Sequence, residues 1–114
     1  MESLKIGRRA VEAASDKQAG DIVLLDTRQL CSFADYFVIC SAESDRQISA
    51  IADEIEKALK EEGVISHHSE GTAESGWVLL DFGDVLVHIF SSDQRGYYKL
   101  DELWGSAAPV VTIQ

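Results

Sequence analysis

Residues 76–90, GWVLLDFGDVLVHIF, decide the fold of this chain. Two apolar arms, rich in β-branched and aromatic residues, flank a short polar bend that contains Gly83. This pattern is typical of a β-hairpin. A two-residue turn of type II′ at Gly83-Asp84 would place Phe82 opposite Val85 on the same face, whereas a three-residue turn would change that sorting.

The two-residue turn gives the predicted hairpin two faces of different chemistry. The wholly apolar face, which suits a core, comprises Val78, Leu80, Phe82, Val85, Val87 and Ile89. The mixed face, which combines an acid and an imidazole with large apolar groups, comprises Trp77, Leu79, Asp81, Leu86, His88 and Phe90. We expect the mixed face either to be half covered by a helix or to dock a partner.

Length and composition predict a single globular domain. The chain has 114 residues, of which 46% are hydrophobic and 26% are charged, and a domain of this size buries a core without metals or disulfides. Its apolar runs are far shorter than the roughly 20 residues that span a bilayer. No secretion signal follows Lys5, Arg8 and Arg9, so we expect a cytoplasmic protein in which Cys31 and Cys40 stay reduced.

The net charge of −10 bears on which kinds of molecule this protein binds. An acidic surface is repelled by phosphate backbones, which argues against direct nucleic-acid binding. A basic protein is the favoured partner because opposite fields speed the encounter. Solubility alone also explains such a charge.

The first part of the chain predicts one helix and two antiparallel strands. Residues 3–17 carry small apolar residues at helical spacing. Residues 21–27 and 36–40 are apolar runs that suit central strands. The connection at residues 28–35 is too short for a crossover helix, so we expect the two strands to pair antiparallel.

A long helix is the clearest element of the middle part. Residues 44–62 carry an apolar stripe, and Ser44 with Gln47 forms a capping box. A strand is expected at residues 64–69, parallel to the strand that precedes the helix. A polar loop is expected at residues 70–75.

The last part of the chain has weaker patterns. A turn is expected at residues 91–96 and a short helical segment at residues 97–104. The stretch from Gly105 onward predicts a loop or a weakly ordered tail. The sequence thus predicts one α/β domain over residues 1–105, with a mixed sheet of about five strands flanked by helices, and a tail over residues 106–114.

No catalytic, cofactor-binding or metal-binding residue is predicted. His67 and His68 are adjacent, and on a strand their side chains point to opposite faces, so they cannot bind one metal together. The chain contains no recognisable nucleophile motif and no Gly-rich phosphate loop. His88 is either a hydrogen-bonded structural histidine or a partner contact.

Asp81 and Asp84, the two acids of the predicted hairpin, have a structural and a binding interpretation. A structural interpretation gives Asp84 a turn role and leaves Asp81 half exposed. A binding interpretation makes both carboxylates acceptors for Lys or Arg of a partner, with Trp77 as an aromatic anchor. The pattern alone leaves both interpretations open.

The chain resembles the ribosomal silencing factors, also called the Iojap family, over most of its length. The matching motifs are Asp16-Lys17, Asp21-Ile22, Leu25-Asp26, residues 32–39 (SFADYFVI), Ser44 with Arg46 and Gln47, residues 50–53 (AIAD), Glu70-Gly71, residues 77–85 and 87–90, Arg95, Tyr98 with Leu100, and Leu103-Trp104. Each motif is weak alone, but the ordered set is specific.

The resemblance implies a non-enzymatic translation repressor. Members of this family bind ribosomal protein fourteen of the large subunit, block joining of the small subunit, and pair as homodimers when free. The implied fold is similar to that of nucleotidyltransferases without their catalytic acids. The candidate partner-binding residues, taken from the predicted hairpin and its neighbours, are Trp77, Asp81, Phe82, Asp84, His88 and Tyr98. Phe82 falls on the apolar face in the predicted register, and Trp104 either extends this patch or packs in the core.

Two alternative functions accompany this prediction. One is a nucleotidyltransferase-like enzyme that uses Asp81 and Asp84. Ala42 and Glu43 stand where such an enzyme needs small residues that let phosphate approach, and they weaken that alternative. The other is a homodimeric interaction module with a different acceptor.

Overall fold

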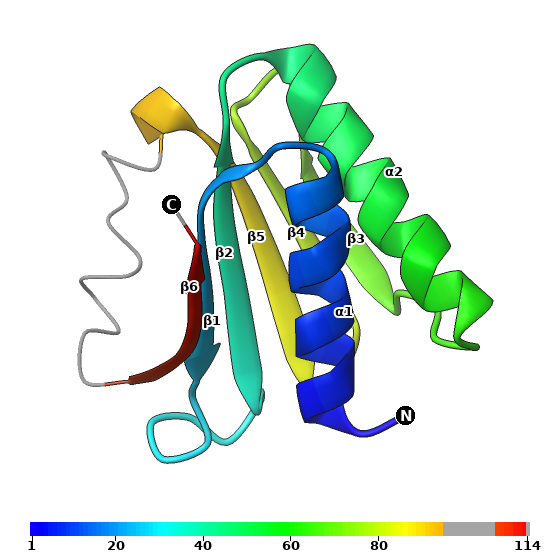
Figure 1. The fold of residues 1–114 in the computed structure, drawn as a ribbon, viewed down its shortest axis with the longest axis vertical. Helices are drawn as coiled ribbons and strands as arrows, with labels where there is room; N and C mark the ends of the chain where they lie inside the picture. The colour runs from blue at the N-terminus through cyan, green and yellow to red at the C-terminus, as the bar shows by residue number, and fades with distance from the viewer. Residues whose placement is uncertain (95–106, 114) are drawn as a thin grey trace.

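The computed structural model describes residues 1–94 and 107–113, which form two helices and six strands (Figure 1). In chain order the elements are α1 (Ser3–Asp16), β1 (Gly20–Asp26), β2 (Tyr36–Ala42), α2 (Asp45–Glu61), β3 (His68–Thr72), β4 (Trp77–Asp81), β5 (Val85–Ser91) and β6 (Ala108–Ile113). Within the described ranges, no helix is both long and apolar enough to cross a membrane.

All six strands belong to one mixed sheet in the order β3-β4-β5-β2-β1-β6. The central pair β2 and β5 is parallel, and the other four neighbouring pairs are antiparallel. The predicted α/β class and the antiparallel pairing of β1 with β2 are confirmed. The sheet has six strands where about five were predicted.

The β4–β5 hairpin has the predicted two-residue turn. The Phe82 N–H donates to the Val85 carbonyl at 2.9 Å, and Gly83 adopts a φ of +89° that favours glycine. Val78 pairs with Ile89 in the resulting register. The division of the hairpin into an apolar and a mixed face is therefore confirmed.

The N-terminus of α2 is capped as predicted. The Ser44 Oγ accepts a hydrogen bond from the Gln47 N–H at 3.1 Å, and the Gln47 Oε1 accepts one from the Glu43 N–H at 2.7 Å. These bonds satisfy two backbone donors where the helix itself supplies no acceptor. They fix the point at which the chain leaves β2 and turns onto the sheet.

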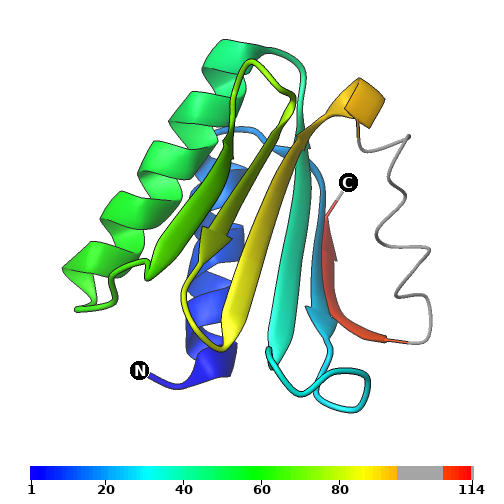
Figure 2. The same ribbon diagram turned by 180° about the vertical axis from the view of Figure 1, so that it is seen from behind.

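Both helices pack on one face of the sheet, which we call the helix face (Figures 1 and 2). Its core joins apolar residues of α1 and α2 to alternate residues of the strands. The hairpin contributes Leu80, Phe82, Val85, Val87 and Ile89 to this core. Beside α1, a groove of about 280 Å³ is lined by Arg8, Val11, Glu12 and Val111.

The structure corrects the prediction for β3. This strand covers His68–Thr72 rather than residues 64–69, so part of the predicted polar loop is a strand. It runs in the same direction as β2, but β4 and β5 lie between them. All five residues of β3 are exposed. Pairing with β4, rather than an apolar pattern of its own, therefore makes this segment a strand.

The structure also corrects the prediction for the C-terminal tail. Residues 108–113 form β6, which pairs with β1 at the edge of the sheet. Pro109 made this segment look unlike a strand in the sequence, because proline argues against a central strand. It is tolerated here because β6 is an edge strand. The helical segment predicted at residues 97–104, with Tyr98 and Trp104, lies outside the described residues.

Candidate docking surface

The mixed face of the hairpin continues onto the neighbouring strand β2. Its hairpin residues pair as Trp77 with Phe90, Leu79 with His88, and Asp81 with Leu86. Phe37 and Ile39 of β2 belong to the same apolar cluster as Trp77, Leu86 and Phe90. We call this surface the Trp77 face. The helices α1 and α2 both lie on the other side of the sheet (Figure 2).

His88 occupies the centre of an aromatic cluster on the Trp77 face. Its ring lies 5.2 Å from that of Phe37, and stacks on those of Phe90 at 6.1 Å and Trp77 at 6.4 Å. The Trp77 Nε1–H donates to the His88 Nδ1 at 3.4 Å. This contact leaves the ring proton of the neutral imidazole on Nε2. His88 is thus both a structural histidine and part of the predicted patch.

Burial controls the protonation of His88. The side chain is only 8% exposed, and burial lowers its pKa from 6.5 to about 4. The imidazole is therefore neutral at physiological pH. Its buried Nε2 has no hydrogen-bond partner among the residues that the structure describes.

The two hairpin acids have different roles. The half-buried Asp81 accepts the Gly83 N–H at 2.8 Å through Oδ1, so its carboxylate fixes the turn. Asp84 is exposed; its backbone carbonyl accepts the N–H groups of Asp35 at 2.7 Å and Tyr36 at 3.2 Å. The structural interpretation of the sequence, which placed Asp84 in the turn and left Asp81 half exposed, is confirmed, and the bond from Gly83 to the Asp81 carboxylate adds a role that it did not include. The exposed carboxylate of Asp84 is oriented toward solvent at the end of the sheet.

The predicted patch residues do not all lie together. Trp77 and Asp81 share the Trp77 face and are half-buried, with the exposed Asp84 in the adjoining turn. Phe82 is 4% exposed and belongs to the core of the helix face. A direct contact from Phe82 to a partner would require the core to open. Tyr98 lies outside the described residues.

The sequence analysis missed one exposed aromatic near this surface. Phe33, in the connection between β1 and β2, is 62% exposed, and its ring lies 6.4 Å from that of Phe37. The only sequence signal was a large aromatic within a short connection that the pattern left outside the predicted strands. In the sequence, Phe33 stood out only as part of the motif at residues 32–39 that carries the family resemblance.

The other histidines lie near the hairpin without forming a metal site. His67 lies beside Gly83, and its N–H donates to the Asp81 carbonyl at 2.7 Å. The Nε2 of His68 lies 2.9 Å from the Glu70 Oε1. Among the described residues, no group of three or more His, Cys, Asp or Glu side chains is placed to hold a metal ion.

A polar cavity of about 350 Å³ lies near the carboxyl end of β2 and the start of α2. It is lined by Gln18, Gly20, Asp21, Ser41, Glu43, Gln47 and Ser92. This is the position at which α/β sheets commonly bind ligands. Of the described residues that line it, two are carboxylic acids and none is a lysine or arginine, so the electrostatics of this part of the lining are unfavourable for a triphosphate.

Comparisons with known proteins identify the family of this chain. The family model described as "Ribosomal silencing factor during starvation" matches residues 1–114. A ribosomal silencing factor RsfS from Halalkalibacterium halodurans is 41% identical over 114 residues, covering 100% of this chain and 97% of the relative. One from Bacillus subtilis is 46% identical over 107 residues, covering 94% and 91%.

Solved structures show the same likeness. A crystal structure of a Chromobacterium violaceum protein matches with a TM-score of 0.88 and 38% identity, covering 100% of this chain and 95% of that one. A crystal structure from Bacillus halodurans matches with a TM-score of 0.79 and 37% identity, covering 97% and 98%. The chain belongs to the ribosomal silencing factor (RsfS) family.

Proposed function

We propose that this protein represses translation by binding ribosomal protein fourteen of the large subunit and thereby blocking the joining of the small subunit. Membership of the silencing-factor family supports the ribosome as the target. The Trp77 face supports the mode of binding, because it combines aromatic side chains with acids and is not covered by α1 or α2. That surface is the observation on which the proposal depends.

The chemistry of the Trp77 face suits a basic protein. A half-buried Trp77 offers the kind of large amphipathic anchor that dominates interface energetics. The exposed carboxylate of Asp84 is available to a lysine or arginine. The net charge of −10 attracts a positively charged surface from a distance.

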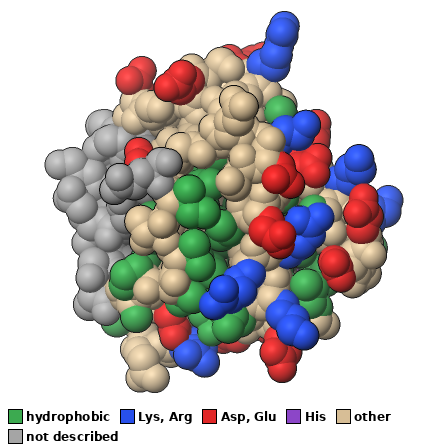
Figure 3. All heavy atoms as spheres, viewed as in Figure 1, with side chains coloured by type: hydrophobic (Ala, Val, Ile, Leu, Met, Phe, Trp, Pro, Cys, Tyr) green, Lys and Arg blue, Asp and Glu red, His purple; other side chains and the backbone are tan. Residues whose placement is uncertain are grey.

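The helix face is a poorer candidate for the same partner. Acidic and basic side chains are interspersed over α1 and α2 (Figure 3), and such a surface does not attract one sign of charge. The Arg9–Glu12 pair at 4.0 Å is one example of this local neutralisation. The acids of the hairpin, in contrast, have no ion pair among the described residues.

The proposed mechanism is steric occlusion, in which no bond is made or broken. A bound domain would occupy space that the small subunit needs. Repression then depends on the affinity and the position of the domain, and not on a catalytic group. For this reason we propose that the role is non-enzymatic. As a separate point, we propose that the free protein pairs with a second copy of itself.

The test removes the charges of the hairpin while keeping its turn. The double variant Asp81→Asn, Asp84→Lys retains an oxygen that accepts the Gly83 N–H. We expect its affinity for purified large subunits, measured by sedimentation, to fall roughly tenfold or more. We expect its thermal unfolding to change by only a few degrees.

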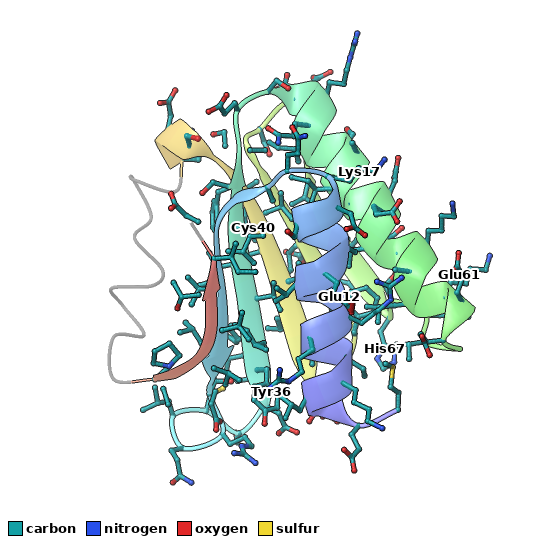
Figure 4. All side chains as sticks on the ribbon, in the orientation of Figure 1. Glu12, Lys17, Tyr36, Cys40, Glu61 and His67 are labelled. Atoms are coloured by element: carbon teal, nitrogen blue, oxygen red, sulfur yellow. The ribbon has the colours of Figure 1, made fainter. Side chains whose placement is uncertain are left out.

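The matched control makes the same change in charge at the far end of α2. Glu61, labelled in Figure 4, and Glu62 are both exposed there. The variant Glu61→Lys, Glu62→Gln should bind large subunits like the wild type. Wild-type affinity of the hairpin variant, or an equal loss in both variants, would contradict the proposed surface.

A further inference from the structure

A continuous series of ring contacts links the β1–β2 connection to the Trp77 face. The ring of Phe33 lies 6.4 Å from that of Phe37, which lies 5.2 Å from that of His88. His88 in turn stacks on Trp77 at 6.4 Å. The exposed Phe33 is therefore an extension of the Trp77 face and not an isolated loop residue.

Backbone and side-chain bonds hold this connection in one shape. The Thr27 N–H donates to the Asp35 carbonyl and its Oγ1 to the Ala34 carbonyl, both at 2.9 Å. The Thr27 carbonyl accepts the N–H groups of Leu30 and Cys31, both at 3.0 Å. Thr27 itself is fully buried. A side chain held on such a frame loses little conformational entropy when it is covered by a partner.

The same connection is tied to the acidic turn of the hairpin. The carbonyl of Asp84 accepts the N–H groups of Asp35 and Tyr36. The hairpin turn and the connection thus lie side by side at one end of the sheet (Figure 2). The Asp35 carboxylate accepts the Ser3 Oγ–H at 2.9 Å, which ties the same connection to the start of α1.

An exposed aromatic on a rigid loop needs an explanation. Leu30 is also exposed, at 39%, so two large apolar side chains of this short connection face solvent. Adjacent exposed apolar residues with a charged border are typical of protein-binding sites. The exposed Asp84 lies in the adjoining hairpin turn and Arg28 of the connection is paired with Asp26, so the uncompensated charge is negative and favours a protein with basic residues over nucleic acid or anionic lipid.

We infer that Phe33 is an anchor residue that enters an apolar pocket on the partner protein, and that lysine or arginine residues border this pocket. The same partner binds the acidic hairpin turn. This inference rests on the proposed function, because it assigns both contacts to one basic ribosomal protein. Leu30 covers the side of the same pocket. Asp84 pairs with the cations at its border.

The test compares two substitutions at Phe33 with a control of equal exposure. Phe33→Ala removes the anchor, and Phe33→Leu keeps apolar volume without the ring. Ile65, in the connection between α2 and β3, is 67% exposed, so Ile65→Ala removes a similarly exposed apolar side chain elsewhere. Affinity for purified large subunits is measured for each, with thermal unfolding and sedimentation equilibrium of the free protein.

We expect Phe33→Ala to weaken binding roughly 10- to 30-fold, Phe33→Leu to weaken it less, and Ile65→Ala to leave it within about twofold. Wild-type affinity of Phe33→Ala, or an equal loss for Ile65→Ala, would overturn the inference. A change in self-association with unchanged subunit affinity would also overturn it, since the occupant would then be a second copy. Failure of the wild type itself to sediment with large subunits would instead refute the proposed function.

Discussion

At the scale of single residues, His88 gives the clearest link between burial and stability. Burial lowers its pKa to about 4 from 6.5. Protonation therefore favours the unfolded chain, and the contribution is fully present above pH 6.5 and lost as the pH falls toward 4. We expect the free energy of unfolding to fall by about 2 kcal/mol between pH 7 and pH 5 from this group.

The variant His88→Gln isolates that contribution. Urea unfolding at several pH values should show a flatter dependence for His88→Gln than for the wild type, even if its stability is lower at every pH. His68→Gln is the matched control, because His68 is exposed and its ring is bonded to Glu70 at the surface. An unchanged slope for His88→Gln would show that the buried imidazole does not control acid stability.

At the scale of elements, the helices and strands that were predicted correctly are those whose own residues carry the pattern. The hairpin register follows from alternation around Gly83-Asp84, and the start of α2 follows from Ser44 and Gln47. β3 could not be found in this way, because its exposed residues are ordered by pairing with β4. β6 likewise depends on β1, a partner distant in sequence. The place of Phe33 beside the hairpin depends on the same long-range pairing.

The β3–β4 pairing leads to a prediction at this scale. Gly71 has a φ of +81°, and a Cβ there would overlap the backbone carbonyl of Trp77. We expect Gly71→Ala to lower the free energy of unfolding by about 3 kcal/mol or more, because it combines backbone strain with a backbone clash. Urea unfolding measures this loss.

Gly63 provides the control that separates strain from clash. Its φ of +83° is nearly the same, but a Cβ there would meet nothing within 4 Å. Gly63→Ala should therefore cost only about 1 kcal/mol. Equal costs at the two positions would show that β3 moves away from β4 without penalty, and β3 would then contribute nothing to the placement of Trp77.

At the scale of the whole molecule, the sheet separates two tasks. The helix face carries the larger core, built from α1, α2 and the apolar side of the hairpin. The smaller cluster on the Trp77 face holds Phe37, Ile39 and Phe90, with the half-buried Trp77 and Leu86 packed against them. If the Trp77 face binds the partner as proposed, we expect substitutions at its exposed edge to change binding with little change in folding.

The net charge of −10 predicts that association with the large subunit depends on salt. Attraction between an acidic domain and a basic protein raises the association rate, and added salt screens it. Raising the ionic strength from about 50 mM to about 500 mM should slow association on the order of tenfold, with a smaller effect on dissociation.

The variants Asp81→Asn, Asp84→Asn and Glu61→Gln, Glu62→Gln lose the same two negative charges, so a difference between them reports position and not total charge. We expect the hairpin variant to lose more of the salt dependence than the α2 variant in stopped-flow kinetics. Equal salt dependence in both variants would mean that the acids of the hairpin do not face the partner.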